Sequence, residues 1–169
     1  MRKAITLLTA VFAISSLGNL QAQDDSEKEA SENKLGAHVG VVHPLITFED
    51  GESTNIGDFY NVGFPVGVTI KKSEKFMFDI EFVPFVDEKS NVNLLFHPGV
   101  LFPMGGDFTF GTRAAFEIGS GAYGFSPLLN KAFPIPKCNS AFFVELVLPV
   151  RFHATGYNTT IALHVGVGF

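Results

Sequence analysis

The side chains in this sequence that could act together chemically are acidic and basic residues separated by even numbers of positions. Because successive side chains of a β-strand point to opposite faces, an even spacing places both members of such a pair on one face. If that face is buried, the charges need partners on neighbouring strands. The pattern predicts a buried polar network that is structural and not catalytic. Its six members are Asp79, Glu81, Arg113, Glu117, Glu145 and Arg151.

A second candidate is the segment His153-Ala154-Thr155, which directly follows a predicted strand. A histidine can take the proton of a hydroxyl nucleophile when a carboxylate orients the imidazole ring. The hydroxyl here would be that of Thr155, and no carboxylate follows it before the C-terminus. The favoured interpretation is therefore that His153 and Thr155 are polar residues at the edge of a hairpin.

No pattern in the sequence is typical of a metal, phosphate or nucleic-acid site. The histidines have no helical or clustered ligand spacing, so we expect structural roles for them, no metal and no cofactor. A formal net charge of −5 provides no basic footprint for nucleic acid. The single cysteine, Cys138, has no partner for an intramolecular disulfide. The histidines are His38, His43, His97, His153 and His164.

Strict alternation of apolar residues runs through the chain from Leu35 to Phe169, and no long segment shows helical spacing. This pattern predicts an all-β domain with eight strands. The longest loop is expected from His43 to Asp58. Seven strands are predicted at 35–41, 64–70, 76–82, 92–102, 108–118, 142–152 and 161–169, and the eighth at 122–129.

The residues between the apolar ones indicate which face lies inside. They are glycines, charged residues and histidines without a single lysine, because the lysines fall in the leader, at strand edges, or in turns and loops. A soluble barrel would carry lysines on its water-facing side, whereas a membrane barrel turns its apolar face outward. We therefore predict a closed antiparallel up-and-down transmembrane β-barrel with a narrow, plugged lumen. The alternative from another class is a periplasmic lipocalin-like carrier, with its apolar face inward.

The N-terminal residues indicate export from the cytoplasm. Arg2 and Lys3 precede an apolar run of about 14 residues, which is too short for a membrane-spanning helix, and a small polar region ends at Ala22. The mature chain then opens with a charged stretch that has nothing to bury. We expect a cleaved signal peptide at 1–22, a flexible charged leader at 23–34 and the barrel at 35–169.

The C-terminal segment alternates without a fault and ends on an aromatic residue. It resembles the closing strand of bacterial outer-membrane β-barrels, and 35–169 as a whole resembles the small eight-stranded barrels of the OmpA transmembrane-domain and OmpX type. The resemblance implies location in the outer membrane of a Gram-negative bacterium, contact with outer-membrane lipid, and passage through periplasmic chaperones and the barrel-assembly machinery. We expect an envelope or structural role without catalysis. The C-terminal assembly signal comprises Ile161, Leu163, Val165, Val167 and Phe169.

One alternative function rests on the histidine segment. His153-Ala154-Thr155 is similar to the His-x-Ser element of outer-membrane lipid A deacylases, eight-stranded barrels with a Ser-His-Glu arrangement. This resemblance implies a hydrolase acting on lipid A. The sequence departs from the pattern at Thr155, where the deacylases have serine, and in the missing carboxylate.

Overall fold

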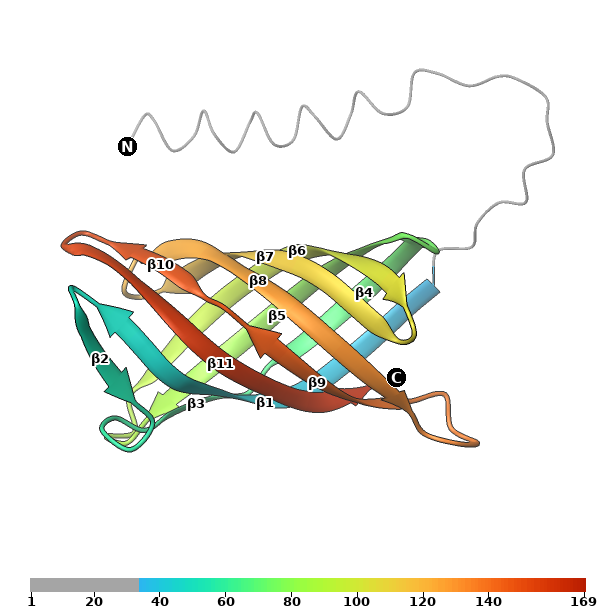
Figure 1. Ribbon diagram of the computed structural model, residues 1–169, viewed down its shortest axis with the longest axis horizontal. Coiled ribbons are helices and arrows are strands. Elements are labelled where there is room, and N and C mark those ends of the chain that lie inside the picture. Colours follow the sequence, from blue (N-terminus) through green and yellow to red (C-terminus); the bar gives the residue numbers. More distant parts are fainter. Residues whose placement is uncertain (1–33) are drawn as a thin grey trace, which may run out of the picture. The chain divides into compact units, whose positions relative to one another are not determined.

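The computed structural model describes residues 34–169, so the predicted signal peptide and all but the last residue of the leader lie outside the described residues. Within this range the chain forms one antiparallel sheet of eleven strands (Figure 1). None of the described residues belongs to a helix that could span a membrane. The strands are β1 (Lys34–Glu49), β2 (Glu52–Asn55), β3 (Asn61–Gly63), β4 (Val66–Ser73), β5 (Phe76–Asp87), β6 (Val92–Gly105), β7 (Phe108–Ile118), β8 (Tyr123–Pro134), β9 (Ala141–Val147), β10 (Val150–His153) and β11 (Gly156–Gly168).

Around the barrel these eleven strands occupy eight positions, as predicted, and we call each position a stave. The short strands β3 and β4 both pair with β1 and with β5, so they form one stave interrupted at Phe64 and Pro65. The strands β9 and β10 both pair with β8 and β11, and they are interrupted at Leu148 and Pro149. Each interruption contains a proline, which has no N–H to donate to the ladder. The strand β2 pairs with β1 alone among the described strands and extends it as a hairpin.

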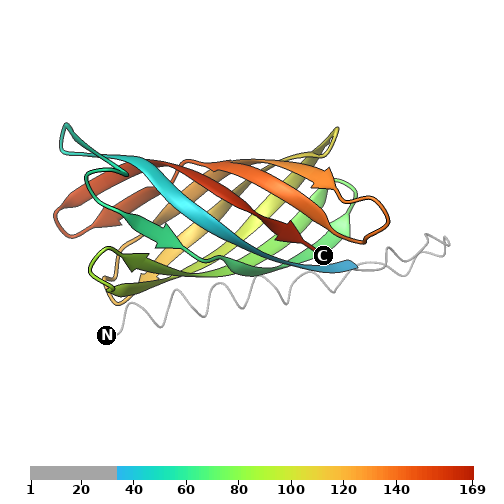
Figure 2. The same cartoon turned by 90° about the horizontal axis from the view of Figure 1, so that it is seen from below.

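The first and last strands close the barrel. Antiparallel pairing between β1 and β11 runs from the pair His38 and Gly168 to the pair Glu49 and Asn158 (Figure 2). Pairing of every stave with two neighbours leaves no open sheet edge around the circumference. The fold of the described residues is therefore a closed antiparallel up-and-down β-barrel.

The barrel has two distinct ends. At the terminal end, where β1 begins and β11 finishes, the strands are joined by turns at 74–75, 106–107 and 135–140 (right side of Figure 1). The opposite end, which we call the loop end, carries the β1–β2 hairpin together with the connections at 56–60, 88–91, 119–122 and 154–155.

The predicted long loop at 43–58 is wrong over most of its length. The strand β1 continues to Glu49, and the chain folds back into β2 through Asp50 and Gly51, which have φ values of 50° and 84°. An Asp-Gly pair with positive φ at both residues is the preferred two-residue hairpin turn, since its twist matches that of the flanking strands. The Asp-Gly pair was present in the sequence, and it predicts this hairpin better than the irregular alternation of the surrounding residues does.

The strand predicted at 122–129 is also longer than expected, because β8 continues to Pro134. Lys131, which falls between the strands predicted at 122–129 and 142–152, consequently lies within a strand. Its ammonium group is 4.7 Å from the centroid of the Phe108 ring and 5.7 Å from that of Phe133. A lysine on an apolar face can lay its stem along aromatic rings and direct its charge toward the rim, where Lys131 lies 3.5 Å from Asp107.

The apolar sets lie on the outside of the barrel, and the polar face lies inside. Ten outward phenylalanines are between 39% and 48% exposed: Phe64, Phe78, Phe82, Phe102, Phe108, Phe110, Phe116, Phe125, Phe133 and Phe142. The lipocalin-like alternative requires a water-facing exterior and does not fit this arrangement. The interior also holds an apolar cluster that the sequence did not predict, formed by Val42, Val83, Leu95, Leu101, Ala115, Leu128, Val147 and Ala162.

Candidate functional site

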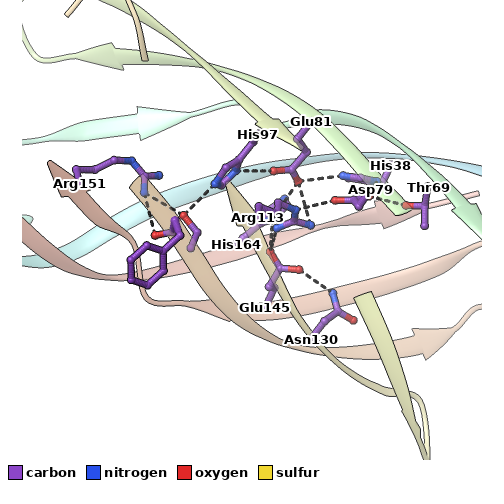
Figure 3. A network of polar contacts seen from close by, with 12 residues as sticks. His38, Thr69, Asp79, Glu81, His97, Arg113, Asn130, Glu145, Arg151 and His164 are labelled. Carbon is purple, nitrogen blue, oxygen red and sulfur yellow. Dashed lines mark hydrogen bonds and ion pairs between the residues drawn. The ribbon is translucent and has the colours of Figure 1, made fainter. Parts of the chain in front are cut away.

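The centre of the lumen is occupied by one guanidinium group shared by three carboxylates (Figure 3). Arg113 on β7 donates from Nε to Asp79 Oδ2 at 2.6 Å and from Nη1 to Glu145 Oε1 at 2.7 Å. Its Nη2 lies 3.4 Å from Glu81 Oε1. The four side chains are at most 4% exposed. Charge-assisted hydrogen bonds of this kind are strong, and burial removes the solvent that would weaken them.

Three histidines from three other strands complete this central network. His38 Nε2 lies 3.0 Å from Glu81 Oε1, and His97 Nδ1 lies 3.2 Å from Glu81 Oε2. His164 Nδ1 lies 3.2 Å from Glu145 Oε1. The alternation in the sequence places these three histidines on the polar face of their strands, but it does not show that they contact the same carboxylates. The register between the strands brings them together.

Glycines on the intervening strands allow residues two strands apart to touch. In the pairing register, Gly99 lies between Asp79 and Arg113, and Gly67 lies between His38 and Glu81. A Cβ atom on Gly99 would stand 2.5 Å from Arg113 Cγ, and one on Gly67 would stand 2.3 Å from His38 Cε1. Because these lumenal glycines have no side chains, they leave room into which the charged side chains of neighbouring strands extend.

The network continues from its centre toward the loop end. His97 Nε2 is 2.9 Å from Ser126 Oγ, which also accepts from Arg151 Nη1 at 3.1 Å. Arg151 Nε lies 3.8 Å from Glu117 Oε1, and Asn93 donates to the other oxygen of Glu117 at 2.9 Å. The six residues predicted for the network are thus all inside the barrel, but in two groups. Glu117 and Arg151 pair with each other, and the bridge from Ser126 to His97 links them to the four central residues.

Polar contacts also extend from the centre toward the terminal end. Thr69 donates from its hydroxyl to Asp79 Oδ1 at 2.7 Å, and Asn130 donates to Glu145 Oε2 at 3.4 Å. The oxygens of Asp79 and Glu145 that point away from Arg113 are therefore also hydrogen-bonded. Carboxylates can stay buried at this depth because both oxygens of each group are hydrogen-bonded.

The network lies between two cavities. A cavity of about 550 Å³ opens toward the loop end and is lined by Glu49, Asp87 and Asn158 among others. A cavity of about 300 Å³ lies on the terminal side. Arg113 and Glu145 line both of them. The side chains of the network thus occupy the narrow part of the lumen between two hollow ends.

The hydrolase candidates lie at the rim, away from the network. His153 ends β10, and its Nε2 is 3.2 Å from Asn158 Nδ2 and 3.7 Å from Glu49 Oε1. Within residues 34–169, no hydrogen bond joins His153 to Thr155. A carboxylate does lie near the imidazole, contrary to what the order along the chain suggested, because β1 and β11 are neighbours in the closed barrel. The hydroxyl that would have to be activated is not held by the imidazole.

The C-terminal residue Phe169 stands at the seam between the first and last strands. Its backbone exchanges two hydrogen bonds with Ala37, at 2.8 Å and 2.9 Å, and its side chain is 57% exposed. Backbone pairing between the first and last parts of the barrel therefore continues beyond β11 to Phe169, an exposed residue beside the cavity at the terminal end.

Comparisons with known proteins find similar solved structures but no matching family or curated relative. No model of a known protein family matches it, and no curated protein matches it significantly. Among similar structures, Ail, the attachment invasion locus protein of Yersinia pestis, in complex with the heparin analogue sucrose octasulfate, is 11% identical, with a TM-score of 0.49 over 82% of this chain and 99% of that one. A de novo designed transmembrane β-barrel is 14% identical, with a TM-score of 0.47 over 86% and 98%. The outer membrane protein OprG from Pseudomonas aeruginosa is 10% identical, with a TM-score of 0.41 over 79% and 93%. The assignment as a barrel rests on this chain's own strand pairings.

Proposed function

We propose that this chain is an integral outer-membrane β-barrel protein of a Gram-negative envelope, with a structural role and without catalysis. The observation that carries the proposal is the belt of outward phenylalanines, each close to half exposed, around a barrel whose charges point inward. Monomeric soluble proteins rarely expose continuous apolar surface of this extent, because it drives aggregation in water. Hydrocarbon is the solvent that this exterior fits.

The strand lengths support the same conclusion. A membrane-crossing strand needs about 9–11 residues when tilted by about 45°. The strands β5, β7 and β8 have 12, 11 and 12 residues, and Figure 1 shows them tilted against the long axis of the barrel. Closure by β1 and β11 satisfies the backbone hydrogen bonds that a bilayer core would leave unmet.

The interior favours a structural role over that of a broad diffusion porin. Eight strands enclose a lumen that side chains can fill. Here the narrow part is filled by Arg113 and its three carboxylates, with the apolar cluster packed on either side. Such a cross-strand network ties β5, β7 and β9 to one another through side chains as well as through the sheet ladder.

We extend the proposal to biogenesis and orientation. The terminal end faces the periplasm, and the outward residues of the last strand form the signal read by the barrel-assembly machinery after delivery by periplasmic chaperones. The alternation of β11 and the exposed ring of Phe169 support this proposal. The outward residues proposed as the signal are Ile161, Leu163, Val165, Val167 and Phe169.

Fractionation of the host cell is the direct test. The chain should sediment with outer membranes and migrate differently on a gel with and without boiling, because a closed barrel resists unfolding by detergent until it is heated. Recovery as a soluble periplasmic monomer would overturn the proposal.

Two lysine substitutions on the outer face, at different depths in the proposed bilayer, test whether this face contacts lipid. Ile80 lies beside Asp79, at the level of the central network, whereas Ile118 is the last residue of β7 at the loop end. A lysine at the bilayer midplane costs about 2–4 kcal/mol, and one near the interface about 0–1 kcal/mol. Ile80→Lys should therefore destabilise the barrel in liposomes clearly more than Ile118→Lys. Equal tolerance of both would indicate an exterior that faces water.

A further inference from the structure

The fixed charges of the central network do not balance. Asp79, Glu81 and Glu145 carry three negative charges, and Arg113 supplies one positive charge. Glu117 and Arg151 balance each other at the loop end. With His38, His97 and His164 neutral, two negative charges remain in a part of the barrel where the carboxylates are at most 3% exposed. Burial of uncompensated charge is costly, so this site favours a ligand that brings two positive charges.

Metal-ligating atoms converge at one side of this network. His38, Asp79 and Glu81 each offer one donor atom, and the three donors lie within 4.8 Å of one another. His38 presents its two ring nitrogens to different carboxylates, with Nε2 3.0 Å from Glu81 Oε1 and Nδ1 3.9 Å from Asp79 Oδ1, and only one of these nitrogens can serve one ion. Metal bonds to nitrogen and oxygen of about 2.0–2.2 Å place neighbouring donors about 3–3.6 Å apart. The three side chains therefore have to move closer together, from a spread of up to 4.8 Å, to coordinate one ion. Arg113 holds Oδ2 of Asp79, and Oδ1, which accepts a hydrogen bond from the Thr69 hydroxyl, lies on the histidine side.

An unpartnered nitrogen in the same network is an independent sign of a missing ligand. His164 is 2% exposed, and its Nε2 has no hydrogen-bond partner in the described structure. A Cβ atom on Gly40 would stand 2.5 Å from this nitrogen, so it faces the lumenal side of β1, two residues from His38. The other ring nitrogen, Nδ1, is 4.0 Å from Glu81 Oε1. Buried polar atoms without partners are rare in folded proteins, and a neutral imidazole nitrogen is a common metal ligand.

Both cavities lead to these donors. His38 and Asp79 line the cavity on the terminal side, and Glu81 and His164 line the larger cavity on the loop side (compare Figure 3). An ion can therefore reach the network from either end without opening of the barrel, and water in the cavities can fill the remaining coordination positions.

We propose that His38, Asp79 and Glu81 form a binding site for one divalent transition-metal ion such as Zn²⁺, with His164 as an additional nitrogen donor. The ion supplies the two charges that Arg113 leaves unmatched. Donors that mix imidazole nitrogen with carboxylate oxygen select Zn²⁺ and similar ions over Mg²⁺ and Ca²⁺, which prefer oxygen alone. The site adds a metal-dependent clamp between β1 and β5.

The test uses the chain purified in detergent, stripped with a chelator and titrated with Co²⁺ and Zn²⁺. We expect one Co²⁺ per barrel, with a visible absorption band of nitrogen and oxygen coordination that Zn²⁺ abolishes and a tenfold excess of Mg²⁺ does not. Zinc at about 100 times its dissociation constant should lower the equilibrium constant for unfolding about 100-fold. A wild-type chain that shows neither the band nor the stabilisation overturns the proposal and indicates that protons alone balance the carboxylates.

Matched variants locate the ion. His38→Gln should weaken binding at least tenfold, and Glu81→Gln should do the same. His43→Gln, at an odd position of the same strand and therefore on its other face, should bind like the wild type. The gel shift on heating reports whether each variant has folded. Unchanged binding in folded His38→Gln and Glu81→Gln, or loss in His43→Gln, would place the ion elsewhere and refute the site.

Discussion

Replacement of Arg113 by methionine removes the one cation that three buried carboxylates share. Loss of one partner from a buried ion pair costs about 3–5 kcal/mol, because the other charge stays buried without compensation. The Arg113 side chain is 4% exposed and its shortest contact is 2.6 Å, so solvent does not reduce this cost. With Asp79, Glu81 and Glu145 all affected, we expect the upper part of that range, about 5 kcal/mol. That value is comparable to the total stability of many domains.

Urea titration of the refolded barrel in detergent, in the presence of a chelator, measures this effect. If the free energy of unfolding falls by about 2 kcal/mol per molar urea, a loss of about 5 kcal/mol lowers the midpoint by about 2.5 M. The fraction that migrates as the folded form on an unheated gel gives a second readout. Both should fall together in Arg113→Met.

Two further variants separate lost charge balance from lost packing. Adding Asp79→Asn and Glu145→Gln to Arg113→Met removes two of the three carboxylate charges that lost their cation, and should recover a large part of the midpoint. Lys131→Ala removes a surface cation whose side chain is 30% exposed, and should shift stability by less than about 0.5 kcal/mol. If Arg113→Met unfolds at the same urea concentration as Lys131→Ala, the central network does not stabilise the barrel and our reasoning is wrong.

The remaining predictions concern the lumenal packing, the C-terminus and the rim. Gly40→Ala should destabilise the barrel by about 1–3 kcal/mol, because its Cβ would stand 2.5 Å from backbone and histidine atoms, whereas Gly36→Ala on the same strand, with its nearest atom at 3.5 Å, should be tolerated in the same urea assay. Deletion of Phe169 should reduce the assembled yield in outer membranes far more than Phe108→Ala at an internal turn; equal yields would show that the terminus is not an assembly signal. His153→Ala should leave the acyl chains of the host's lipid A unchanged by mass spectrometry, because no hydroxyl among residues 34–169 is hydrogen-bonded to this imidazole. A shift by one acyl chain would instead establish a hydrolase.

Local patterns in the sequence were sufficient to predict the strand faces. An extended chain alternates its side chains whatever its neighbours are, so the position of Phe110 outside and of Arg113 inside follows from parity once the medium is known. The medium follows from composition, since a lysine-free polar face is unsuited to an outer surface in water. The hairpin at Asp50 and Gly51 was equally local, and a closer reading of its turn chemistry would have predicted it.

The identity of the partners depended on the tertiary structure. Asp79 and Arg113 are separated by a whole strand, and they meet because the register places Gly99 between them. His38 and Glu81 meet across Gly67 in the same way.

What the sequence by itself determined is therefore the class of fold, the number of staves and the polar residues that face the lumen. Only the tertiary structure decided which of those residues touch, that three histidines converge on two carboxylates, and that the rim histidine lies beside Glu49. The physical reason is that alternation is a property of one strand with a period of two, whereas contact across a lumen depends on the register summed around a closed barrel. A shift of two residues at one seam would preserve every inward and outward position and still change every pair across that seam.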